Sequence, residues 1–243
     1  MTLDVKGKVA VLTGAGGGIG RVIAVRLAGL GMRLVLLGGN NLAKLEETKA
    51  LVENKTEVAV LSGNLTDTSL LKTLADKAVE VYGKVDVLIN NAGVAQNTPY
   101  ESVTEEEYDR IMAINTKAPY FLTQKLLPAL KKSEAPTIIN VASVVAKTGY
   151  PLQSVYSASK HALLGFSESL AKEVYRDGVR VHAICPGGVY TDMVKISRPD
   201  LSPEGMIMPE DIADVVEFFI THRTNAVIDE ISIHRVGKTP FSL

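Results

Sequence analysis

Residues 9–20 read Val-Ala-Val-Leu-Thr-Gly-Ala-Gly-Gly-Gly-Ile-Gly, which is a short apolar run followed by a loop rich in glycine. After the loop, apolar residues recur at helical spacing to about residue 30. Glycines let the backbone approach a pyrophosphate, and the free N–H groups of a helix N-terminus attract its charge. The flanking strand and helix favour a dinucleotide site over an ordinary surface turn. The expected cofactor contacts in this loop are Gly14, Gly16, Gly17, Gly18, Ile19 and Gly20.

The same alternation of apolar runs and amphipathic stretches continues to the end of the chain. Most runs lack a polar–apolar alternation, which is typical of strands covered on both faces in a parallel sheet. The pattern predicts an α/β fold with a single domain over 1–243: a doubly wound, Rossmann-type, seven-stranded parallel sheet with helices on both faces. The predicted strands are 9–12, 34–37, 58–61, 85–89, 138–142, 179–185 and 227–233. The predicted helices are about 18–30, 41–54, 67–82, 104–131, 153–177 and 209–222.

The composition excludes several classes of protein. With 46% hydrophobic residues, the chain is unlike disordered proteins, which are poor in apolar side chains. A net charge of −1 lacks the basic excess of a nucleic-acid-binding protein, and no apolar run approaches the ~18 residues that span a bilayer. One cysteine, Cys185, and four histidines without ligand spacing predict no metal site. We therefore expect no nucleic-acid or membrane partner, and a cytoplasmic location.

The least regular segment of the chain is 186–209, which contains four prolines. It follows a predicted strand, and ligands of open α/β sheets bind at the carboxyl ends of strands. The segment 188–208 is therefore predicted to be a substrate lid.

Tyr156 and Lys160 are four residues apart in a predicted helix, so that both side chains can face one cleft. A lysine ammonium beside a phenol stabilises the phenolate and lowers its pKa, which suits a tyrosine to proton transfer. Ser143 lies thirteen residues before Tyr156, at the end of a predicted strand. A Tyr-x-x-x-Lys pair arises easily by chance. The pair in this chain is significant because it follows the glycine loop and the turn 90–93, Asn-Asn-Ala-Gly, in this order.

In this order the motifs resemble those of the classical short-chain dehydrogenase/reductase family over essentially the whole chain. The residues that carry the resemblance are Thr13, Gly14, Gly18, Ile19, Gly20, Asn90, Asn91, Ala92, Gly93, Asn115, Ser143, Tyr156, Lys160, Pro186 and Gly187. The resemblance implies that Tyr156 is the general acid/base and that Ser143 hydrogen-bonds the substrate oxygen. It further implies that Lys160 binds the nicotinamide ribose and assists Tyr156, and that Asn115 holds a water in a proton relay. The implied cofactor contacts outside the glycine loop are Gly39, Asn40, Asn64, Leu65, Asn91, Ala92, Gly93, Tyr156, Lys160, Pro186, Gly187, Val189 and Thr191.

The implied activity is that of an NAD(P)-dependent oxidoreductase, which interconverts a secondary alcohol and a ketone in a small molecule. A 3-ketoacyl thioester reductase of the same family is the alternative. An epimerase or dehydratase of this fold usually carries a further substrate domain, for which this chain has no room. A catalytically inactive, cofactor-sensing regulator is the alternative from another class, and such proteins typically lose the tyrosine or the lysine. The family also implies a homodimer or homotetramer, in which the helices 104–131 and 153–177 pair with their symmetry mates. The apolar residues expected to supply this interface and the side that faces the sheet are Phe121, Leu122, Leu126, Leu130, Leu163, Phe166 and Leu170.

The chain departs from the family pattern after the second predicted strand. The family carries there an acid for the ribose of NAD or a basic residue for the phosphate of NADP, whereas this chain has Gly38-Gly39-Asn40. No acidic residue occurs between Gly38 and Glu46, so that no carboxylate of this segment repels a 2′-phosphate. The amides of Gly39 and Asn40, with Lys44, could bind that phosphate. NADP(H) is therefore favoured over NAD(H).

A second departure lies at the end of the chain. The last predicted strand, 227–233, is not followed by the Asp-Gly-Gly tail of many ketoacyl-reductase-like members. This absence argues against an acyl-carrier substrate and against the usual tetramer.

Overall fold

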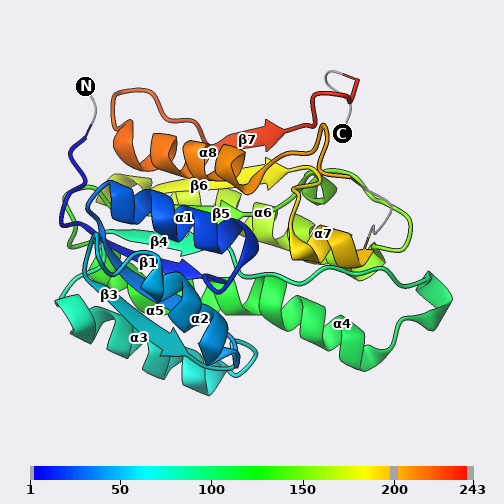
Figure 1. Cartoon of the computed structure of the whole chain (residues 1–243), viewed down its shortest axis with the longest axis horizontal. Coiled ribbons are helices and arrows are strands. Elements are labelled where there is room, and N and C mark those ends of the chain that lie inside the picture. Colours follow the sequence, from blue (N-terminus) through cyan, green and yellow to red (C-terminus); the bar gives the residue numbers. More distant parts are fainter. Residues whose placement is uncertain (1–2, 198–201, 240–243) are drawn as a thin grey trace.

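The computed structural model describes residues 3–197 and 202–239. In these ranges seven strands form one sheet in the order β3-β2-β1-β4-β5-β6-β7, and each neighbouring pair is parallel (Figure 1). The strands are β1 (Val9–Thr13), β2 (Arg33–Gly38), β3 (Val58–Ser62), β4 (Val87–Asn90), β5 (Thr137–Val141), β6 (Arg180–Pro186) and β7 (Glu230–Ile233). The predicted fold class is confirmed, since each predicted strand has its counterpart in the sheet.

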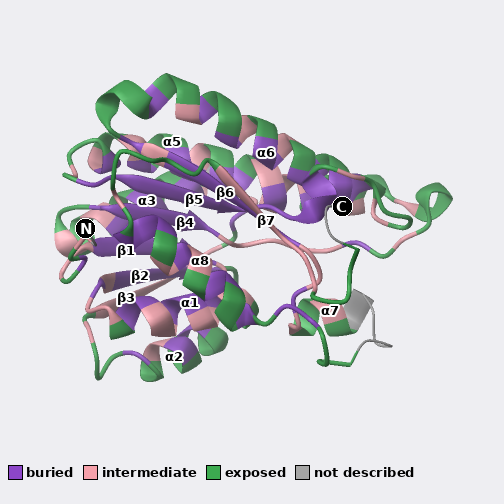
Figure 2. Cartoon of the chain, turned by 90° about the horizontal axis from the view of Figure 1, so that it is seen from above, coloured by how far each residue is buried: buried purple, intermediate pink, exposed green. Residues whose placement is uncertain are grey.

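Helices cover both faces of the sheet, and Figure 2 shows the buried strands between two helical layers with exposed outer surfaces. One layer contains α1 (Gly18–Gly29), α2 (Leu42–Ala50) and α8 (Pro209–Thr221). The other layer contains α3 (Thr68–Tyr82), α5 (Ala118–Leu130) and α6 (Ser154–Val174). Each layer has its own apolar core, as the absence of polar–apolar alternation in the strands predicts.

Two shorter helices, α4 (Glu105–Met112) and α7 (Asp192–Ser197), lie beyond the carboxyl ends of the strands, at the right of Figure 1. The sequence predicts α4 only as part of a longer helix, and it predicts no helix at α7. This end of the sheet is where ligands of doubly wound folds bind.

The predicted helix 104–131 is interrupted by a π-helical turn, Ala113–Lys117, between α4 and α5. In this turn the N–H of Ala118 donates to the carbonyl of Ala113, five residues back. Pro119 has no N–H, so that the carbonyl of Asn115, four residues earlier, lacks its usual helical donor. The wide turn therefore occurs at a residue of the expected site.

The last strand is shorter than predicted. The sequence predicts a strand over 227–233, whereas β7 begins at Glu230, which pairs with Ala183 of β6. Val227 and Ile228 are exposed, which explains why these apolar residues misled the prediction.

Candidate active site

The glycine loop between β1 and α1 leaves no room for side chains at Gly14 and Gly20. A Cβ atom on Gly14 would lie 2.8 Å from the Cα of Ala92, and one on Gly20 would lie 2.2 Å from the carbonyl oxygen of Gly14. Gly14 also has a φ of +67°, a conformation that favours glycine. The loop therefore packs its backbone directly against the turn after β4.

The N-terminus of α1 is open to an anion. Gly17, the residue before the helix, has no side chain that could cap it, and the first turn carries no acidic residue. Free N–H groups and the positive end of the helix dipole together make a phosphate site. The loop and helix therefore fit the pyrophosphate of a dinucleotide.

Thr13 joins the glycine loop to the turn after β4. Its Oγ1 accepts hydrogen bonds from the backbone N–H groups of Asn91 and Ala92, both at 3.0 Å. Asn91 Nδ2 donates in return to the carbonyl of Thr13 at 3.1 Å. The first two predicted motifs are thus held side by side at the point where the strand order reverses.

Ser143 and Tyr156 meet across the same cleft. Ser143 follows β5, and its hydroxyl donates to the carbonyl of Pro186 at 3.3 Å. Burial raises the pKa of the Tyr156 phenol, and a hydrogen bond with the Ser143 side chain opposes that shift. The prediction that Lys160 lowers the pKa of Tyr156 is therefore wrong for this structure, and Tyr156 is a protonated phenol at neutral pH.

Lys160 lies one turn after Tyr156 on α6, as the spacing predicts. Its Nζ is 5.8 Å from the centre of the Tyr156 ring and donates to the carbonyl of Val141 at 2.9 Å. The side chain is buried, with 4% of its surface exposed, and burial lowers its pKa to about 8. Lys160 is therefore mostly protonated at pH 7, but it loses its proton far more readily than an exposed lysine.

Asn115 is fully buried, and its amide is engaged on both sides. Its Nδ2 donates to the carbonyl of Val94 and to Ser159 Oγ, both at 3.0 Å, and its Oδ1 accepts from the N–H of Val94 at 2.8 Å. Two donors and one acceptor of the amide are thereby used. The backbone carbonyl, which Pro119 leaves without its helical donor, is suited to holding a water.

A cleft of about 100 Å³ brings many of the predicted site residues together. Its predicted members are Ile19, Asn91, Gly93, Ser143, Tyr156, Lys160, Pro186, Gly187, Val189 and Thr191. Sequence reasoning missed four further lining residues, which are Val141, Ala142, Met193 and Val194. The last two belong to α7, and their only signal was their place in the predicted lid.

The other predicted cofactor contacts do not line this cleft: Gly14, Gly16, Gly17, Gly18, Gly20 and Ala92 belong to the glycine loop, the start of α1 and the turn after β4, and four more lie after β2 and β3. Gly39 and Asn40 are exposed after β2, and Asn64 and Leu65 follow β3. Asn64 Oδ1 accepts from the N–H of Thr66 at 3.1 Å, while Leu65 is buried in the core under α3. These residues are positioned along the edge of the sheet toward which an extended dinucleotide would reach.

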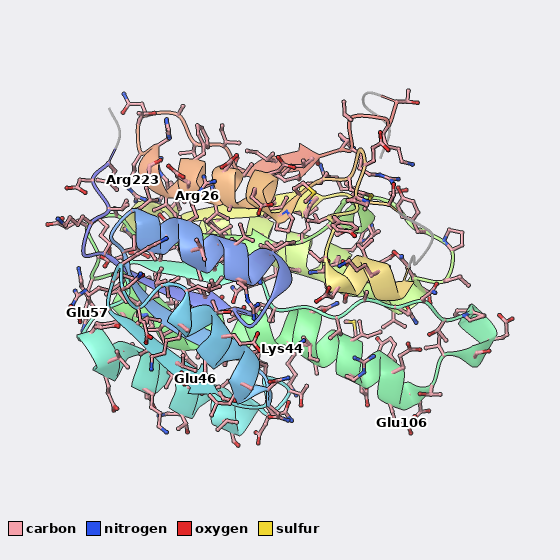
Figure 3. All side chains as sticks on the ribbon, viewed as in Figure 1. Arg26, Lys44, Glu46, Glu57, Glu106 and Arg223 are labelled. Carbon is pink, nitrogen blue, oxygen red and sulfur yellow. The ribbon has the colours of Figure 1, made fainter. Side chains whose placement is uncertain are left out.

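No acid lies at the end of β2, and the two glycines there differ in the space around them. A Cβ atom on Gly38 would lie 2.8 Å from the side chain of Leu45, whereas one on Gly39 would meet nothing within 4 Å. Lys44 lies beside the glycine loop. A Cβ atom on Gly16 would lie 3.1 Å from the Cβ of Lys44. Glu46, labelled with Lys44 in Figure 3, pairs with Lys49 at 3.6 Å further along α2. The carboxylate of Glu47 is held by Arg21 at 2.7 Å, and Arg21 also donates to the carbonyl of Gly16 in the loop at 2.9 Å.

The predicted lid, 188–208, is described except for 198–201, which lie outside the described residues. Its two ends meet in a parallel bridge between Val189 and Ile207, and the N–H of Tyr190 donates to Ile207 at 2.8 Å. The segment therefore leaves the sheet and returns to nearly the same point, with α7 over the cleft between.

Other reactive groups do not form a site. Cys185 is buried, and burial raises the pKa of its thiol to about 12. Within the ranges that the structure describes, no group of His, Cys, Asp and Glu side chains could hold a metal ion. The helices of these ranges are also too short or too polar to cross a membrane.

Comparisons with known proteins agree with this geometry. Residues 8–202 match the short chain dehydrogenase family. A 3-oxoacyl-[acyl-carrier-protein] reductase of Thermotoga maritima is 31% identical over 94% of this chain and 96% of its own. The levodione reductase of Leifsonia aquatica is 34% identical over 81% of this chain and 75% of its own. A crystal structure of carveol dehydrogenase from Mycobacterium avium in complex with NAD has a TM-score of 0.86 at 25% identity, over 95% of this chain and 96% of that one.

Proposed function

This chain belongs to the short-chain dehydrogenase family of oxidoreductases, and from that premise we propose that it interconverts a ketone and a secondary alcohol with Tyr156 as the acid–base group. The observation that carries the proposal is the convergence of Ser143, Tyr156 and Lys160 on one cleft beside the glycine loop. A catalytically inactive regulator would have no need of all three side chains together with Asn115.

Tyr156 transfers the proton in this proposal. During reduction its hydroxyl donates to the carbonyl oxygen of the ketone, and during oxidation its phenolate accepts the proton of the alcohol. The Ser143 hydroxyl would turn from the carbonyl of Pro186 to donate to the same oxygen, and it would stabilise the negative charge that develops there. The raised pKa of Tyr156 keeps the phenol protonated, as reduction requires.

Lys160 and Asn115 resupply that proton. With a pKa of about 8, Lys160 can donate a proton near neutral pH and regain it from solvent. A water on the backbone carbonyl of Asn115 would connect Lys160 to solvent. The buried amide of Asn115 keeps that carbonyl in place, because it is bonded to Val94 and Ser159.

A bound nicotinamide dinucleotide would supply or accept the hydride. The glycine loop and the α1 N-terminus would hold its pyrophosphate, and Asn91, Ala92 and Gly93 would line its adenosine side. Lys160 would bind the nicotinamide ribose. Gly93 adjoins this lysine, because a Cβ on it would lie 3.5 Å from Lys160 Nζ.

NADP(H) is the preferred cofactor in this proposal. No carboxylate that would select NAD lies at the end of β2, where the chain has Gly38, Gly39 and Asn40. Lys44 lies next to the glycine loop, and its ammonium makes no ion pair with the described residues. A 2′-phosphate with a charge close to −2 would gain this cation and the amides of Gly39 and Asn40. Because the chain has no basic residue at Gly39, the preference is expected to be small.

The substrate is a small carbonyl compound or its alcohol. The cleft has a volume of about 100 Å³ and is lined largely by apolar side chains, with α7 of the lid at one side. A 3-oxoacyl thioester is the second candidate, which the similarity to the Thermotoga maritima reductase favours. The absence of the Asp-Gly-Gly tail argues against a thioester that is attached to an acyl carrier protein.

The enzyme is at least a homodimer in this proposal. Leu122, Leu126 and Leu130 of α5 are buried against the sheet, so that they are not available to a partner. The outer groove between α5 and α6 contains the rings of Tyr120 and Phe166, 4.9 Å apart, together with polar side chains that include Gln124 and Glu173. Tyr120 is 45% exposed in the single chain, and pairing of these helices with a second copy would cover it.

A ketone screen tests the proposed function. The chain is mixed with NADPH or NADH and with cyclohexane-1,4-dione, ethyl acetoacetate or acetoacetyl-CoA, and the loss of nicotinamide fluorescence is followed. Oxidation of the cofactor that depends on a ketone is expected. Binding of cofactor without its oxidation by any ketone would favour the regulatory alternative.

A further inference from the structure

Gln96, in the loop after β4, hydrogen-bonds the first turn of α6. Its Oε1 accepts from the backbone N–H of Val155 at 2.9 Å and from that of Tyr156 at 3.2 Å. The side chain is buried, with 2% of its surface exposed. An acceptor that lies 59 and 60 residues upstream thus takes the place of a local helix cap.

The first turn of α6 has no cap of its own. Gln153, which precedes the helix, makes no capping bond with its side chain within the described residues, whereas Asp67 and Thr104 cap α3 and α4 locally. The first four N–H groups of a helix lack helical acceptors. Gln96 satisfies two of them, and one belongs to Tyr156 itself.

The backbone of Tyr156 is also held through its carbonyl. Ser159 Oγ donates to that oxygen at 2.7 Å and accepts from Asn115 Nδ2 at 3.0 Å. Asn115 in turn binds the N–H and the carbonyl of Val94, in the loop that carries Gln96. A closed circuit of hydrogen bonds therefore surrounds the backbone of the proposed acid–base residue.

The nitrogen end of the Gln96 amide makes no hydrogen bond within the part of the chain that the structure describes, so that a substitution can remove the bonds to α6 alone. Its Nε2 has no acceptor among residues 3–197 and 202–239. The side chain is thus held through its oxygen alone. A leucine at this position would remove the two bonds to α6 and would break no other hydrogen bond of the side chain.

We propose that Gln96 is a positioning residue of the reaction, which fixes the Tyr156 hydroxyl relative to the substrate oxygen by capping α6 from a distant loop. A displacement of about 1 Å in a catalytic group can cost ~10²-fold in rate. The inference rests on the proposed role of Tyr156, since Gln96 acts only through that residue.

The test compares kcat, cofactor affinity and melting temperature among variants, with the best ketone of the screen. Gln96→Leu is expected to lower kcat at least tenfold while the Kd of NADPH changes less than twofold. Gln96→Glu is expected to restore most of kcat, because a carboxyl oxygen can accept the same two bonds and is favoured at a helix N-terminus. Thr104→Ala is the matched control, because it removes the cap of α4 and is expected to lower the melting temperature without lowering kcat.

Wild-type kcat in Gln96→Leu would overturn the inference, and so would an equal loss in Gln96→Leu and Gln96→Glu. If the leucine variant does not fold, Gln96→Asn takes its place, because the shorter side chain withdraws the oxygen from α6. A wild-type chain that reduces no ketone, or a Tyr156→Phe variant with full activity, would instead overturn the proposed function.

Discussion

The ammonium of Lys160 donates to the carbonyl of Val141 at 2.9 Å while it lies 5.8 Å from the centre of the Tyr156 ring. The bond holds a buried cation at the end of β5, next to Ser143. Burial of this charge costs stability, and its position beside the phenol explains why the chain retains it. The proposed chemistry therefore opposes stability at this residue.

Lys160→Met is expected to stabilise the protein at pH 7 by about 1–3 kcal/mol, because it removes a buried charge. The gain is smaller where the lost hydrogen bond to Val141 offsets more of it. The pKa of Lys160 in the fold, about 8, lies below its ordinary value of 10.5. The destabilisation is therefore complete below pH 8 and is relieved as the pH rises from 8 to 10.5. Urea unfolding should show the variant's advantage shrinking over that window. An advantage that stays constant from pH 7 to 10.5 would contradict the lowered pKa.

Gly39→Arg is expected to raise the ratio of kcat/KM for NADPH to that for NADH by about tenfold, because a guanidinium can bind the 2′-phosphate bidentately. The position is exposed, and a Cβ there meets nothing within 4 Å, so that the fold should tolerate the change. Lys44→Ala is expected to lower the same ratio several-fold. A wild-type preference for NADH of tenfold or more would show that another residue reads the ribose.

Tyr120→Arg is expected to convert the wild-type oligomer to a smaller species. The substitution removes the ring that contacts Phe166 and places a second charged residue, besides Glu173, in the groove between α5 and α6, where a partner helix would have to bury it. Sedimentation velocity at micromolar concentration measures both proteins. A monomeric wild-type chain would contradict the proposed assembly, as would an arginine variant with unchanged mass.

The sequence predicted the fold from local patterns that the structure preserves. The glycine loop after Val9–Thr13 and the repeated apolar runs each act within a few residues, so that periodicity and turn chemistry reveal them. The i, i+4 spacing of Tyr156 and Lys160 is equally local, and both residues line the cleft.

The features that the sequence did not predict depend on contacts between distant residues. Gln96 and Tyr156 are 60 positions apart, and no local pattern announces their hydrogen bond. The π-helical turn at Ala113–Lys117 had a signal in Pro119, but amphipathic periodicity alone favoured one continuous helix. The glycine at position 38 needed the packing of Leu45 to be explained.

Proton transfer by Tyr156 is tested most directly by the kcat of Tyr156→Phe in ketone reduction. The phenylalanine ring preserves the packing and removes only the hydroxyl, so that kcat is expected to fall by at least about 10²-fold. The Kd of NADPH and the melting temperature, measured on the same samples, should stay close to those of the wild type. A kcat within a few-fold of the wild-type value would contradict the assignment of Tyr156 as the acid–base group.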